Sequence, residues 1–84
     1  MIDRDIKSEF WQEVEDRKEG SKIFQKVYNW LNNDCLGGII LSGNVFWVEL
    51  QGYGSTLPNY ILNFIKKWGK KRGYIYLYDL PERG

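Results

Sequence analysis

The 84-residue sequence predicts an α+β fold with the element order helix, helix, strand, strand, helix, strand, in which helices pack on a small mixed three-stranded sheet. Two observations predict it. Apolar residues recur every three to four positions in three segments, as in amphipathic helices, and shorter segments are rich in β-branched and aromatic residues, as in strands. A chain of this length buries only about 60% of the surface of its unfolded form. We therefore expect residues 1–84 to form a single domain.

The first two helices are predicted in the N-terminal half. Residues 4–18 place their large apolar side chains on one face, and Asp3 or Asp5 can cap this helix by accepting a backbone N–H bond. The sequence Glu-Gly-Ser at residues 19–21 interrupts the apolar period. Ser21 can then cap a second helix that keeps the same period.

A β-hairpin is predicted over residues 38–50. Residues 32–38 are rich in Asn, Asp and Gly, which favour turns, so they end the helical region. Two apolar segments follow and are joined at Ser42-Gly43-Asn44, where Gly-Asn supplies the positive φ angles of a tight turn. The two strands should be antiparallel neighbours.

The third helix shows the clearest apolar period in the chain. Ser55 or Thr56 can cap its start, and Gly69 and Gly73 bracket its end. The last strand is predicted over residues 74–80. A strand, helix, strand unit usually forms a crossover that places its two strands parallel, so we expect a mixed sheet.

The composition excludes several classes of protein. The absence of histidine excludes Ser-His and Cys-His nucleophiles and His-containing zinc sites, and the lone Cys35 cannot form an internal disulfide. No apolar run approaches the roughly 18 residues of a membrane span, and the charged N-terminus lacks the apolar segment of a signal peptide. We expect an intracellular, cytoplasmic protein with no membrane partner, no metal and no cofactor.

Cationic side chains gather in the C-terminal half. Residues 1–34 contain eight acids and six bases, whereas residues 35–84 contain three acids and six bases, so a polyanion would approach the second segment. A local alternative exists, because the carbonyl groups at a helix C-terminus favour lysines. The predicted phosphate contacts are Lys66, Lys67, Lys70, Lys71 and Arg72.

Three tyrosines follow the basic run. On a regular strand, Tyr74, Tyr76 and Tyr78 would share one face, where aromatic rings can stack on unpaired bases. In the alternative interpretation the rings cover a helix and only their hydroxyl groups reach the rim. The sequence leaves both interpretations open.

Other features are compatible with different sites. Glu49 follows apolar residues, and burial beside Trp47 would raise its pKa. The sequence Gly-Tyr-Gly-Ser-Thr at residues 52–56 is a weak candidate for anion binding by backbone N–H groups. Exposed aromatic residues are frequent anchors of protein interfaces and could also support a homodimer. The candidate anchors are Trp11, Trp30, Trp47 and Tyr53.

One segment resembles a known family. Residues 44–80, with the strand VFWVELQ at 45–51, are similar to the C-terminal part of restriction-endonuclease-like nucleases of the P-D…(D/E)-x-K type, in particular to the small virus-type replication-repair nucleases. Glu49 matches the metal-binding acid of that motif. Gln51 stands where the family has its lysine, and residues 36–42 lack the preceding acid. The resemblance therefore implies an incomplete metal site and no nuclease activity.

Taken together, these patterns predict a small non-enzymatic binding module. Its partner would be a nucleic acid, contacted through the basic helix end and the aromatic strand. The alternative is a small viral or mobile-element regulator or inhibitor that binds a host protein through exposed aromatic residues.

Overall fold

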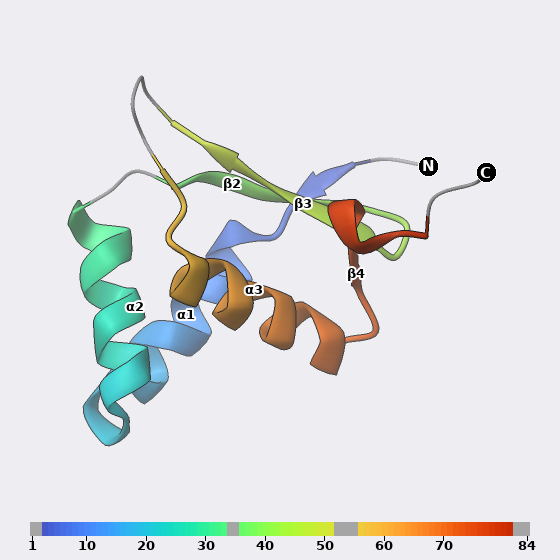
Figure 1. The fold of residues 1–84 in the computed structure, drawn as a ribbon. Helices are drawn as coiled ribbons and strands as arrows, with labels where there is room; N and C mark the ends of the chain where they lie inside the picture. The colour runs from blue at the N-terminus through green and yellow to red at the C-terminus, as the bar shows by residue number, and fades with distance from the viewer. Residues whose placement is uncertain (1–2, 34–35, 52–55, 82–84) are drawn as a thin grey trace.

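The helices lie on one side of a β-sheet, and the other side of the sheet carries no helix from the described part of the chain (Figure 1). The computed structural model describes residues 3–33, 36–51 and 56–81. None of the helices in these ranges is long and apolar enough to cross a membrane. The elements, in chain order, are β1 (Arg4–Asp5), α1 (Lys7–Arg17), the 3-10 turn η1 (Lys18–Gly20), α2 (Lys22–Asn33), β2 (Leu36–Ser42), β3 (Val45–Leu50), α3 (Asn59–Lys71), β4 (Ile75–Tyr76) and the 3-10 turn η2 (Leu77–Asp79).

The sheet has the strand order β1-β2-β3-β4, with antiparallel pairs except for the parallel pair β3 and β4. The α+β class, the order of helices, hairpin, helix and strand, and the mixed sheet are therefore confirmed. The sheet has four described strands rather than three, because Arg4 and Asp5 pair with Leu41 and Ile40 of β2. Helix α1 consequently begins at Lys7, three residues later than predicted.

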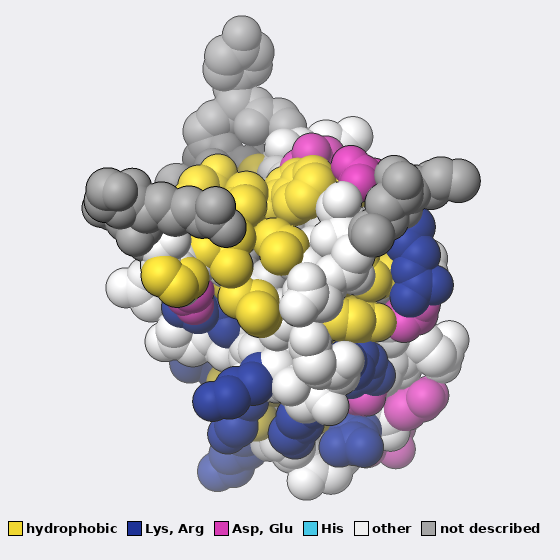
Figure 2. All heavy atoms as spheres, turned by 90° about the vertical axis from the view of Figure 1, so that its right-hand side faces the viewer, with side chains coloured by type: hydrophobic (Ala, Val, Ile, Leu, Met, Phe, Trp, Pro, Cys, Tyr) yellow, Lys and Arg dark blue, Asp and Glu magenta, His cyan; other side chains and the backbone are white. Residues whose placement is uncertain are grey.

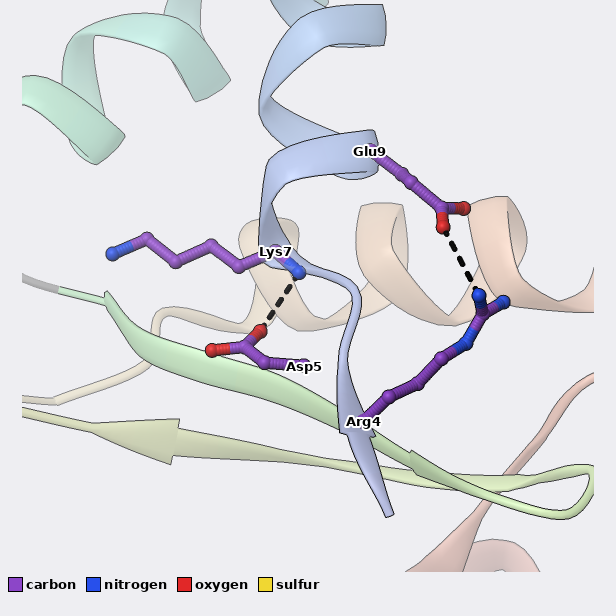
Figure 3. A network of polar contacts seen from close by, with 4 residues as sticks. All are labelled: Arg4, Asp5, Lys7 and Glu9. Carbon is purple, nitrogen blue, oxygen red and sulfur yellow. Dashed lines mark hydrogen bonds and ion pairs between the residues drawn. The ribbon is translucent and has the colours of Figure 1, made fainter. Parts of the chain in front are cut away.

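Asp5 joins the first strand to the first helix. Its Oδ1 accepts hydrogen bonds from the backbone N–H groups of Lys7, at 2.8 Å, and of Ile39 in β2, at 3.2 Å; Figure 3 shows the first of these. The N-cap residue of α1 is Ile6, so the prediction of Asp3 or Asp5 in that position is wrong. The Asp5 carboxylate nevertheless satisfies an N–H group in the first turn, which is what a capping side chain does.

The predicted interruption at residues 19–21 is present as η1, after which Ser21 is extended and α2 begins. The hairpin turn is also as expected in its length, since Ser42 pairs with Val45. Its positive φ is confined to Gly43, at 64°, with no positive φ at Asn44. This is the φ pattern of a type II′ turn.

Helix α3 starts later than its predicted caps imply. Its N-cap residue is Pro58, with no side-chain cap, and Thr56 lies before the helix. The other predicted cap, Ser55, is outside the described residues. The helix ends at Lys71, and Gly73 follows its C-cap with a φ of +82°, as the predicted glycine bracket implies. The N–H groups of Gly73 and Tyr74 bond to Lys70 O and Gly69 O in a Schellman arrangement.

The predicted last strand is much shorter in the structure. Only Ile75 and Tyr76 pair with β3, and the chain then turns through η2. The prediction that Tyr74, Tyr76 and Tyr78 line one face of a strand is therefore wrong. The alternation in the sequence is that of a strand, but the chain leaves the sheet after two pairs.

The core lies between the helices and one face of the sheet. Phe46 of β3 is fully buried, and Phe10 of α1 packs edge-on against Phe64 and Trp68 of α3. Among the described residues, the buried hydrophobic side chains are Ile6, Phe10, Val14, Val27, Trp30, Leu31, Ile39, Leu41, Phe46, Ile61, Ile65 and Trp68.

Candidate nucleic-acid interface

A groove lies between the C-terminal half of α3 and the segment formed by β4 and η2. Its volume is about 420 Å³. We call it the α3–β4 groove. Five of the eight residues predicted to bind nucleic acid line it, and two further residues, Ile75 and Asp79, complete the lining. The five are Lys66, Lys67, Lys70, Tyr74 and Tyr76.

The apolar period of α3 explains why its lysines face solvent. Ile61, Ile65 and Trp68 occupy the buried side of the helix. The four lysines of the helix fall outside this buried side, and residues four apart are neighbours on the helix surface. Lys66 and Lys70 therefore form one row along the groove, and Lys67 and Lys71 form a second row beside it.

Lys66 is held by an acidic partner across the groove. Its Nζ lies 2.8 Å from Oδ2 of Asp79 in η2, and it also lies 5.7 Å from the centre of the Tyr76 ring. Lys67, Lys70 and Lys71 are exposed, and none of them forms an ion pair with an acid in the described ranges. These three lysines are the cations most available to an anionic ligand.

Arg72 plays a different role from the lysines. Its Nη2 donates a hydrogen bond of 2.9 Å to Glu13 Oε1 in α1, and its Cζ lies 4.2 Å from the centre of the Trp68 ring. The guanidinium thus links the end of α3 to α1 and covers a core side chain. This tertiary contact leaves Arg72 less available to a phosphate than the sequence pattern implies.

The three tyrosines have different environments. Tyr74 packs against Trp68 with ring centres 6.4 Å apart, and Tyr76 packs against Phe46 at 5.4 Å. Tyr78 is 77% exposed, and its ring centre lies 5.6 Å from that of Tyr76. Two rings therefore help to cover the core, and Tyr78 is the ring most open to a stacking partner.

Burial raises the pKa of the Tyr76 hydroxyl above its ordinary value of 10.0. Tyr78 reinforces this rise in pKa, Lys66 opposes it and Asp79 adds to it. Because the phenol resists ionisation, the groove gains no negative charge from Tyr76 near neutral pH. An anionic ligand would meet a neutral ring there.

The candidate protein-binding residues do not form one surface. Trp30 is only 7% exposed and belongs to the core, whereas Trp11 is half-buried against Tyr28, with ring centres 5.9 Å apart. Trp47 is half-buried on the sheet face that points away from the helices. Tyr53 is outside the described residues.

That outer sheet face carries an apolar patch that the sequence analysis missed. Ile40 pairs with Trp47, and Val45 pairs with Ile75, which is 42% exposed. Leu77 and Leu80, which follow β4 in the chain, are also exposed apolar residues. Figure 2 shows hydrophobic side chains gathered on the upper part of one side of the molecule, with Lys and Arg side chains below them. The sequence feature that could have identified this patch is the set of apolar residues that alternate with Tyr74, Tyr76 and Tyr78 along the chain.

Glu49 does not have the buried setting expected for it. The side chain is exposed, and its Oε2 accepts a 3.2 Å hydrogen bond from Trp47 Nε1. Across the described ranges, His, Cys, Asp and Glu side chains form no group of three or more that could hold a metal ion. Most of the Gly-Tyr-Gly-Ser-Thr segment, residues 52–55, lies outside those ranges.

Comparisons of the chain with models of protein families, with curated proteins and with solved structures found no match.

Proposed function

We propose that this protein is a non-enzymatic module that binds single-stranded nucleic acid in the α3–β4 groove. The observation that carries the proposal is the convergence of cations and rings in one concavity. Lysines from α3 and tyrosines from the β4 segment, which are separate elements, line the same groove. Proteins that bind single strands combine a positively charged groove with aromatic rings in this way.

The roles of the side chains follow from their surroundings. Lys67 and Lys70 have exposed ammonium groups and would contact phosphates. Tyr78 lies outside the groove lining but packs against the groove residue Tyr76, and its exposed ring would stack on a base next to the groove. Base stacking on an aromatic side chain contributes about 1–3 kcal/mol. A site of this kind binds with little sequence preference and loses affinity as salt rises.

The test is a salt titration with a fluorescent oligothymidylate of about 16 nucleotides. The wild-type affinity should fall steadily between about 50 and 200 mM salt. The double variant Lys67→Gln/Lys70→Gln should bind more weakly, and its slope of log affinity against log salt should be shallower by about 1.4, since each phosphate contact on a single strand contributes about 0.7.

The matched control is Lys22→Gln/Lys26→Gln, which removes the same charge from α2. It should bind like the wild type. No binding by the wild type at low salt, or equal losses in the two double variants, would show that the groove is not a nucleic-acid site.

A second candidate function is that of a small viral or mobile-element protein that regulates or inhibits a host protein. The observation that favours it is the apolar patch on the outer sheet face, which contains the half-buried Trp47 and the exposed Ile75. We expect Trp47→Ala to abolish capture of a specific protein from cell extracts treated with nuclease. Capture that depends on intact nucleic acid would instead favour the groove. Light scattering over a range of concentrations tests the homodimer.

A further inference from the structure

The side of α3 that faces α1 has a second, smaller hollow. Its volume is about 50 Å³, and Arg17, Lys67, Trp68 and Lys71 are among its lining residues. We call it the α1–α3 hollow. A cavity needs about 10–15 Å³ by this measure to hold one water molecule, so the hollow has room for a few oxygen-sized atoms but not for a nucleobase.

Lys67 lines both the α3–β4 groove and the α1–α3 hollow. The two concavities are therefore neighbours that meet at this one residue on the surface of α3.

The hollow is strongly cationic. Arg17, Lys67 and Lys71 contribute three positive charges to its lining, and Glu13 contributes the single negative charge. Glu13 is already bonded to Arg72, at 2.9 Å. Arg17 has an exposed side chain whose Cζ lies 5.8 Å from the Phe24 ring centre, and it forms no ion pair with an acid in the described ranges.

Trp68 also lines the hollow. The residue is 3% exposed, and its Nε1 is buried with no hydrogen-bond acceptor among the residues that the structure describes. A buried N–H group without an acceptor is unfavourable, so an oxygen atom that reaches it would be stabilised. The size and charge of the hollow suit phosphate oxygens.

We infer that a single strand bound in the α3–β4 groove continues across Lys67 into the α1–α3 hollow, where Arg17 and Lys71 contact its phosphate backbone. This inference rests on the proposed function and makes it more specific. The ligand is a strand of several nucleotides that crosses α3, rather than a mononucleotide or an isolated base. Arg17 becomes a binding residue that the sequence pattern did not identify.

The experiment compares oligothymidylates of about 4 and about 16 nucleotides, the limits of typical single-strand sites. The wild type should bind the long strand more tightly and with a steeper salt slope. The variant Arg17→Gln/Lys71→Gln should bind the short strand like the wild type. With the long strand, the slope of log affinity against log salt for this variant should be shallower by about 1.4 than for the wild type, because two phosphate contacts are lost.

The Lys22→Gln/Lys26→Gln protein again controls for net charge, and circular dichroism verifies that each variant is folded. One outcome would overturn only this inference. If Arg17→Gln/Lys71→Gln binds the long strand as tightly as the wild type, and Lys67→Gln/Lys70→Gln binds it more weakly, the strand does not cross α3 into the hollow. The α3–β4 groove would then remain the binding site. If the wild type binds neither strand, the proposed function and this inference both fail.

Discussion

The ring of Phe46 lies directly against the backbone of Gly69. A Cβ atom placed on Gly69 would be 2.7 Å from Cε1 of Phe46, closer than side chains pack. Phe46 is fully buried in β3 and Gly69 is buried in α3, so neither can move away freely. This contact sets how closely α3 approaches the sheet, and it therefore sets the position of the lysines on the same helix.

Gly69→Ala should destabilise the protein by about 1–3 kcal/mol, because overpacking a core has that cost. In an exposed helix the same change would instead stabilise by up to about 1 kcal/mol. Urea unfolding of the wild type and the variant measures this change in the free energy of unfolding. Gly20→Ala is the control, since no atom lies within 4 Å of its added Cβ, and it should be neutral or slightly stabilising. A stabilising Gly69→Ala would contradict the packing described.

The ion pair between Glu13 and Arg72 should contribute measurable coupling. Their side chains are 26% and 32% exposed, and the Nη2 to Oε1 distance is 2.9 Å. A double-mutant cycle with Glu13→Gln and Arg72→Gln should give a coupling free energy of about 0.5–1 kcal/mol that shrinks in high salt. The pair Arg4 and Glu9, at 3.7 Å and 59% and 48% exposed (Figure 3), should give less. Equal coupling in the two cycles would refute this ranking.

Removal of the Asp5 carboxylate should weaken the junction of β1, α1 and β2. Asp5→Ala leaves the N–H groups of Lys7 and Ile39 without this acceptor, and we expect a loss of about 1–2 kcal/mol. Asp5→Asn keeps a side-chain oxygen and should lose less. The exposed Asp3 provides the control, because Asp3→Ala should change the free energy of unfolding by less than about 0.5 kcal/mol. If Asp5→Ala and Asp3→Ala lower the free energy of unfolding by the same amount, the Asp5 carboxylate does not stabilise this junction.

Tyr76 should make the protein less stable at alkaline pH. Burial raises its pKa above 10.0, so the folded state keeps a proton that the unfolded state releases as pH rises past about 10. The free energy of unfolding then falls as pH rises through this range, and Tyr76→Phe should make that fall shallower. Urea unfolding at a series of pH values measures both slopes, with Tyr60→Phe as the control. Identical slopes for wild type and Tyr76→Phe would exclude this contribution.

Local periodicity was sufficient to predict the three helices and the hairpin, because each depends on residues close together in the chain. It was insufficient for β1, since Arg4 and Asp5 form a strand only through pairing with Ile40 and Leu41, more than 30 positions away. For the last strand, periodicity predicted too long an element. Tyrosines alternate regularly with other residues over 74–80, but only Ile75 and Tyr76 have partners on β3.

The candidate site was predictable to a similar degree. The basic run was predicted at the C-terminal end of the third helix, and the structure places Lys67, Lys70 and Lys71 there with exposed side chains. The partners of Lys66 and Arg72 could not be predicted, because Asp79 and Glu13 approach them only through tertiary packing. The binding of nucleic acid itself stays a prediction.

The contact between Lys66 and Asp79 has a consequence for how the groove would respond to a ligand. Asp79 presents to Lys66 the same negatively charged oxygen that a phosphate would present, at 2.8 Å. Under the proposed function it is an internal competitor, which a strand must displace before Lys66 can contact the backbone. The same ion pair fastens η2 to α3. Occupancy of the groove and release of the C-terminal turn would therefore be coupled through a single lysine.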